Sequence, residues 1–144
     1  MLSNNNSIQE INVYVKGVVY QNKGKGFALS AWAVKGEPVH YIEHEVNSAY
    51  NSEYVALCDA VEKKHADDVV LHIYSNQKDL IDNLSRIKRQ YDAQEKKLNL
   101  PDYQRRIITG CDFTWCPLKE SPNDLLRLRD MAMREVKKRG EARV

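Results

Sequence analysis

The chain has 144 residues, the usual size of one domain and long enough to bury a core. Its formal net charge of +2 gives no overall argument for a nucleic-acid partner. The sequence starts without the basic and apolar segments of a signal peptide, and no apolar run approaches the ~20 residues of a membrane helix. We expect a cytoplasmic protein with one domain over residues 11–139, a loosely ordered segment 1–10, a tail 140–144, and no membrane partner.

The first part of the sequence predicts three strands. Residues 11–20 are rich in β-branched and aromatic side chains, and a turn with two glycines, 21–26, joins them to a second such run, 27–34. After another turn at 36–38, residues 39–46 alternate between apolar and polar side chains, as a half-buried strand does. Three consecutive strands with short turns predict an antiparallel meander.

Helices alternate with strands in the next part. Apolar residues take helical spacing after Asn51, a candidate N-cap, as far as His65. The run 69–74 is almost continuously apolar, which predicts a central strand covered on both faces. Helical spacing returns over 80–87, and a charged, helix-prone segment follows over 88–100.

One more strand and helix complete the sequence. Residues 107–116 predict the last strand. Pro122 suits the first turn of a helix whose apolar residues recur on one face as far as Val136. A meander followed by strands that helices connect predicts a mixed sheet with helices packed on its faces.

Cysteines and histidines suggest no metal centre. The three cysteines, Cys58, Cys111 and Cys116, are too few and too widely spaced for a disulfide framework or a zinc site, so we expect reduced thiols, with the last two on opposite faces of a strand. His40 and His44 share one face of the third strand, and we expect them at the surface. His72 lies in the apolar strand, where we expect a buried residue with its hydrogen bonds satisfied.

Five short motifs, in the expected order, resemble those of the ribonuclease H family of the ribonuclease H-like superfamily. They are Tyr14-Val15-Lys16-Gly17, Gly24-Lys25-Gly26-Phe27-Ala28, Asn51-Ser52-Glu53-Tyr54-Val55-Ala56-Leu57, Ile73-Tyr74-Ser75-Asn76-Gln77, and Trp115-Cys116-Pro117 followed by Asn123. The resemblance covers about 11–136. It implies an α/β fold with a five-stranded mixed sheet, an antiparallel meander plus two parallel strands, flanked by helices.

The catalytic carboxylates of that family are mostly missing. In the family, four carboxylates hold two divalent cations that cleave RNA–DNA hybrids. The resemblance places these positions here at Lys16, Glu53, Asn76 and Arg127, so that only Glu53 keeps its carboxylate. Residues 11–36 contain no Asp or Glu, so no shift of the alignment restores the first ligand.

The remaining acids leave an alternative open. Asp79 could replace the ligand at the end of the central strand, and Asp124 or Asp130 could replace the last one. A lysine at the first position repels magnesium, so we expect no metal or cofactor, with Mg²⁺ or Mn²⁺ required only if a rearranged acidic site exists. Lys16 and Arg127 either neutralise a buried Glu53 as an ion pair or hold a phosphate without cutting it.

A basic segment is the candidate nucleic-acid surface. Its cations follow the second helix, where some members of the family carry a basic protrusion that grips the hybrid; they are Lys88, Arg89, Lys96, Lys97, Arg105 and Arg106. Tyr91 and Tyr103 could stack on bases or pack on the domain. The same segment could equally be a solvated helical hairpin or a protein-docking surface.

Three functions follow from these observations. The first is a pseudo-enzyme, a catalytically degenerate ribonuclease H-like module that binds nucleic acid, such as an RNA–DNA hybrid or duplex, or works within a nucleic-acid complex. The second is an active metal-dependent hybrid nuclease in which Glu53 meets at least two of Asp79, Asp124 and Asp130. The third is a purely structural domain that binds a protein partner through an exposed apolar patch.

Overall fold

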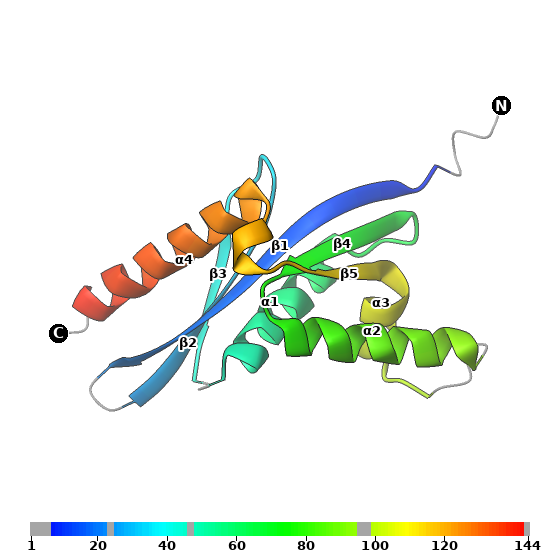
Figure 1. The fold of residues 1–144 in the computed structure, drawn as a ribbon, viewed down its shortest axis with the longest axis horizontal. Helices are drawn as coiled ribbons and strands as arrows, with labels where there is room; N and C mark the ends of the chain where they lie inside the picture. Colours follow the sequence, from blue (N-terminus) through cyan, green and yellow to red (C-terminus); the bar gives the residue numbers. More distant parts are fainter. Residues whose placement is uncertain (1–6, 23–24, 46–47, 95–98, 143–144) are drawn as a thin grey trace.

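The computed structural model describes residues 7–22, 25–45, 48–94 and 99–142 (Figure 1). Its elements in chain order are β1 (Gln9–Asn22), β2 (Lys25–Val34), β3 (His40–His44), α1 (Ala49–Lys64), β4 (Val69–Ser75), α2 (Lys78–Ala93), α3 (Asp102–Gly110), β5 (Cys111–Trp115), the short 3-10 helix η2 (Leu118–Glu120) and α4 (Asn123–Ala142). No helix in these ranges is long and apolar enough to span a membrane.

The five strands form one mixed sheet in the order β3-β2-β1-β4-β5. The pairs β1–β2 and β2–β3 are antiparallel, whereas β1–β4 and β4–β5 are parallel. This confirms the predicted meander with two parallel strands. The first half of β1 pairs with β4 as far as Tyr14, opposite Tyr74, and β1 then continues beside β2 alone.

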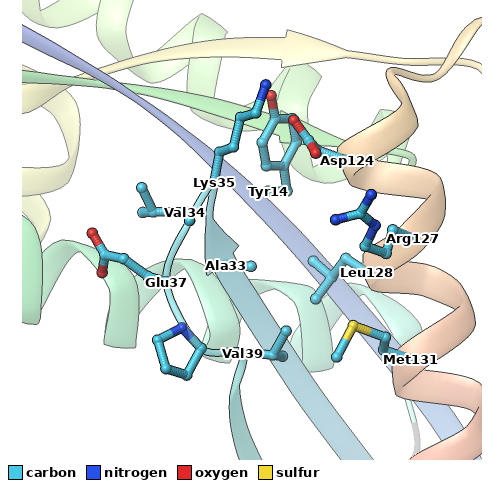
Figure 2. Close-up of a pocket in the computed structure, with 12 residues that line it drawn as sticks. Tyr14, Ala33, Val34, Lys35, Glu37, Val39, Asp124, Arg127, Leu128 and Met131 are labelled. Carbon is cyan, nitrogen blue, oxygen red and sulfur yellow. The ribbon is translucent and has the colours of Figure 1, made fainter.

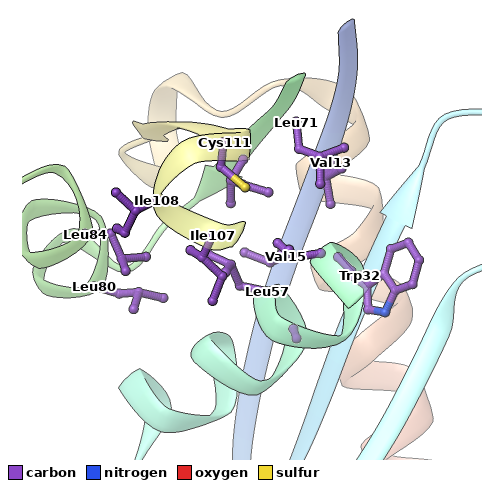
Figure 3. Close-up of a cluster of buried hydrophobic side chains, with 14 of the residues drawn as sticks. Val13, Val15, Trp32, Leu57, Leu71, Leu80, Leu84, Ile107, Ile108 and Cys111 are labelled. Atoms are coloured by element: carbon purple, nitrogen blue, oxygen red, sulfur yellow. The ribbon is translucent and has the colours of Figure 1, made fainter. Parts of the chain in front are cut away.

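Helices cover the two faces of the sheet unequally. Helices α1, α2 and α3 pack on one face, over a core that includes Val13, Val15 and Trp32 (Figure 3). Helix α4 packs on the other face, where Tyr14 is buried with Leu125 of the helix. Successive residues of β1 thus point to opposite layers, as the two-residue period of a strand requires.

The strand predicted over 107–116 is wrong at its start. Residues 102–110 form α3, and the strand β5 begins only at Cys111. Ile107 and Ile108 carry β-branched side chains, which favour a strand locally, but both are buried beside Leu84 of α2. Packing against neighbouring helices therefore outweighs the local preference.

Several boundaries also differ from those predicted. The N-cap of α1 is Ser48, whose Oγ accepts a hydrogen bond from the backbone N–H of Asn51 at 3.4 Å; Asn51 itself lies inside the helix. Strand β1 begins at Gln9, inside the segment expected to be loosely ordered, and α4 extends to Ala142, inside the expected tail. Residues 1–6 and 143–144 lie outside the described residues.

The histidines are better partnered than expected. His40 and His44 are half-buried rather than at the surface: His40 stacks on the ring of Trp32 with centroids 4.0 Å apart, and Nε2 of His44 lies 2.6 Å from Oγ of Ser30. Edge strand β3 uses them to pack on β2. The side chain of His72 does have polar partners but is 25% exposed.

The three thiols are free, and Cys111 and Cys116 belong to the clusters on opposite sides of the sheet, as predicted. Burial raises the pKa of Cys111 to about 12, so this thiol stays protonated at neutral pH.

Candidate functional site

Strand β4 ends beside β1, which continues past it, and we call this end of the pairing the notch. The ladder between the two parallel strands reaches Tyr14 and Tyr74, and β4 stops one residue later at Ser75. The carboxyl ends of parallel strands, beside a change of strand direction, are where sheets of this class place ligand sites. Helix α1 begins under this notch and directs Glu53 into it.

Glu53 is held by three groups from two strands. Its Oε1 accepts the backbone N–H of Gly17 at 3.3 Å and lies 3.5 Å from Nζ of Lys16. The hydroxyl of Ser75 donates a hydrogen bond to Oε2. Only 1% of Glu53 is exposed, so this carboxylate exchanges water for an ammonium, a hydroxyl and an amide.

Gly17 allows the start of α1 to lie against the backbone of β1. A Cβ atom at this position would lie 2.5 Å from Cβ of Ser52 and 2.6 Å from the backbone nitrogen of Glu53. The start of α1 therefore touches the backbone of β1 directly, and any side chain at residue 17 would force the two elements apart.

Burial dominates the electrostatics of the site. It raises the pKa of Glu53 above its ordinary value, and the charge of Lys16 and the hydrogen bonds from Ser75 and Gly17 oppose the shift without cancelling it. Lys16 keeps 18% of its side chain exposed whereas Glu53 is buried, so the ion pair joins a partly solvated ammonium to a desolvated carboxylate.

A second polar cluster fastens the start of α1 to β2, beside Glu53. The Ser30 hydroxyl donates to the backbone carbonyl of Ser52 at 2.6 Å, and the Ser52 hydroxyl donates to the carbonyl of Leu29 at 3.2 Å. Burial lowers the pKa of His44, which contacts Ser30 from the edge strand. These contacts position the turn of helix that carries Glu53.

Ser75, which the sequence reasoning missed, lies where Asn76 was expected. Nδ2 of Asn76 instead donates to the carbonyl of Cys116 and to Oγ of Ser121, both at 2.8 Å. Residues 69, 71, 73 and 75 are the buried ones in β4, so the two-residue period of the strand carried the signal that Ser75 faces Glu53.

Arg127 also takes a different place from the one predicted. Its side chain is exposed on α4 and lines a cavity with Tyr14. Among the described residues, Glu53 contacts Lys16, Gly17 and Ser75 instead. Burial raises the pKa of Tyr14, and the negative charge of nearby Asp124 raises it further.

The donor set of the notch does not fit a magnesium pair. Mg²⁺ binds through oxygen ligands, commonly carboxylates, whereas the groups here are one carboxylate, one hydroxyl and an ammonium that repels cations. Across the part of the chain that the structure describes, no three His, Cys, Asp or Glu side chains are grouped to hold a metal. Glu53 therefore does not meet two of Asp79, Asp124 and Asp130.

The predicted nucleic-acid residues fall into three groups. Nζ of Lys88 donates to the carbonyl of Ile108 at 2.8 Å, and Arg105 pairs with Asp102, so these two cations serve contacts within the domain. Arg89 and Arg106 are exposed. The last two, Lys96 and Lys97, lie outside the described residues.

The two tyrosines of this region also differ. Tyr91 is 5% exposed and packs in the core, so it is not available to stack on a base, whereas Tyr103 is 55% exposed.

Comparison with known proteins identifies the fold. No family model matches the sequence, and no curated protein matches it. Among solved structures, the chain is similar to the crystal structure of LC9-RNase H1, a type 1 RNase H with the type 2 active-site motif. The TM-score is 0.55 at 9% sequence identity, and the match covers 88% of this chain and 71% of that chain. The five-stranded mixed sheet with its helices is therefore a ribonuclease H-like fold.

Proposed function

We propose that this chain is a ribonuclease H-like domain that binds nucleic acid without cleaving it by a two-metal mechanism. The observation that carries the proposal is the ammonium of Lys16, 3.5 Å from the buried carboxylate of Glu53. In a two-metal nuclease, mobile cations neutralise the clustered carboxylates and activate water. Here a covalently attached cation neutralises a single carboxylate and generates no nucleophile.

The ion pair is well suited to a structural task at the notch. Lys16 comes from β1, Glu53 from α1 and Ser75 from the end of β4, so their contacts join three elements. A buried acid is retained only when it is paired and hydrogen-bonded, and both conditions are met here. The notch then keeps the shape of the fold while losing its metal chemistry.

Nucleic-acid binding is the finer part of the proposal. It rests on the likeness of the fold to an RNase H and on the exposed guanidinium groups of Arg89 and Arg106. Arginine pairs with phosphate oxygens through two parallel N–H donors, without reading sequence. Partners of this kind include an RNA–DNA hybrid or another duplex, and a protein partner is the competing outcome.

A salt series tests this binding. We expect fluorescence anisotropy with a labelled RNA–DNA hybrid to show an affinity that falls as salt increases, because counterions return to the phosphates. The Arg89→Gln/Arg106→Gln double variant should lower the slope of log affinity against log salt by about 2, one unit for each lost phosphate contact. Lys63→Gln/Lys137→Gln removes the same charge from exposed positions on α1 and α4 and should leave the slope nearly unchanged.

Two results would contradict the proposal. Salt-independent or undetectable binding to the hybrid, to duplexes and to single strands would assign the domain to a protein-binding role. Equal losses in the two double variants would show that the net charge of the domain, not contacts made by Arg89 and Arg106, governs the affinity.

A further inference from the structure

A cavity lies on the opposite side of the sheet from α1, between α4 and the turn that joins β2 to β3 (Figure 2). Its volume is about 240 Å³, a little below the range of drug-sized ligand pockets, so it suits a small molecule. Tyr14 and Ala33 of the sheet form its floor, and the first turns of α4 form one wall.

Only some of the charged side chains that line this cavity have a partner of opposite charge. Glu37 accepts a hydrogen bond from Nζ of Lys64 at 2.6 Å, and Asp124 lies close enough to Tyr14 for its charge to raise the pKa of that hydroxyl further after burial. Lys35 and Arg127 are both exposed, and neither has an ion-pair partner among the described residues. Glu37 is already neutralised by Lys64, so the two cations Lys35 and Arg127 outnumber Asp124, the one acid left in the lining, and the cavity carries a net positive charge.

Apolar side chains line the space below these cations. Val39 lies at the end of the turn, just before β3, and Leu128 and Met131 face it from neighbouring turns of α4 (Figure 2). Lys35 and Arg127 stand on the two walls, one on the turn and one on the helix (Figure 2). The cavity thus combines two cations with an apolar wall.

We propose that this cavity binds a small organic anion, with its phosphate or carboxylate between Lys35 and Arg127 and its apolar body against Val39, Leu128 and Met131. Two cations on opposite walls can share one anionic group, and the apolar body gains from leaving water. Inorganic phosphate has the charge but lacks the apolar body. The proposal does not depend on nucleic-acid binding by the domain.

Titration of the full chain by ¹H–¹⁵N NMR tests the cavity with three probes: adenosine 5′-monophosphate, hexanoate and inorganic phosphate. We expect at least one of the two organic anions to shift the amide signals of Gly36 and Leu128 saturably. Its affinity should exceed that of inorganic phosphate by about five-fold or more, because only the organic probes bury apolar surface. A nucleotide preference would identify a phosphate ligand, and a hexanoate preference a carboxylate.

Matched variants separate this site from general charge attraction. Lys35→Gln and Arg127→Gln should each lower the affinity for the organic anion by about five-fold. Met131→Gln should reduce the difference in affinity between the organic anion and inorganic phosphate. Arg134→Gln removes the same charge from an exposed position of α4 outside the cavity and should leave the affinity unchanged. Absence of saturable shifts, shifts away from the cavity, equal affinity for the three probes, or insensitivity to the variants would each overturn the proposal.

Discussion

Gly17→Ala should lower the free energy of unfolding by about 3 kcal/mol, at the upper end of what overpacking in a core costs. The new methyl group would lie 2.5 Å from Cβ of Ser52 and 2.6 Å from the backbone nitrogen of Glu53. The second neighbour is backbone, so relief requires that β1 and α1 separate, which also stretches the hydrogen bond from Gly17 to Glu53. Denaturant unfolding followed by circular dichroism measures the loss.

Gly140→Ala is the matched control. This glycine lies in α4 with nothing within 4 Å of a Cβ atom, and alanine is the better helix former by up to about 1 kcal/mol. The control should therefore be as stable as the wild type or slightly more so. If the free energy of unfolding of Gly17→Ala differs from that of the wild type by less than roughly 0.5 kcal/mol, the spread of neutral surface substitutions, β1 and α1 do not meet as closely as described.

Lys16→Met should destabilise the domain by about 3 kcal/mol at neutral pH, the lower end of what removing one partner of a buried ion pair costs. The substitution keeps an unbranched side chain, one atom shorter and uncharged, and leaves the carboxylate of Glu53, 1% exposed, without its counter-ion. Removing one partner of a buried pair is costly because the other charge stays desolvated, although Glu53 limits the loss by taking up a proton. Adding Glu53→Gln to this variant should restore much of the stability, since the amide carries no charge.

The contribution of Glu53 to the free energy of unfolding depends on pH. The folded state raises the pKa of Glu53 above its ordinary value of 4.5, so the unfolded chain releases this proton at lower pH than the folded chain does. The contribution of Glu53 is therefore most favourable below pH 4.5 and declines as pH rises from there through the raised pKa.

Lys16→Met should steepen this decline, and variants with Glu53→Gln should lack it. Urea unfolding of the wild type, Lys16→Met, Glu53→Gln and the double variant from pH 4 to pH 8 measures the difference. If Lys16→Met matches the wild type at every pH, the ion pair with Glu53 contributes nothing to the folded state.

The sheet was predictable because its signals are local. Residues 11–20 and 27–34 are dense in β-branched and aromatic side chains, and 69–74 has the continuous apolar character of a central strand. The same kind of local signal misled over Ile107 and Ile108, where burial beside α2 stabilises a helix. The N-cap was misplaced by three residues because Ser48 and Asn51 are both good caps.

The candidate site was only half predictable for a different reason. Glu53 and Lys16 were found by motif, but their contact depends on β1, α1 and β4 meeting at one point, which no local pattern encodes. Ser75 could have been found from the alternation of buried residues along β4. The place of Arg127 in a cavity with Lys35 depends on how α4 lies over the sheet, and the sequence contains no periodic signal for that.

The most direct test of the central claim is a cleavage assay with a labelled RNA–DNA hybrid in Mg²⁺ and in Mn²⁺, beside an active ribonuclease H in the same buffers. Because Lys16 already neutralises the buried carboxylate, we expect intact hybrid in both metals while the active enzyme degrades it. Metal-dependent cleavage by the wild type that Glu53→Gln abolishes would contradict the account and place a working metal centre at the notch.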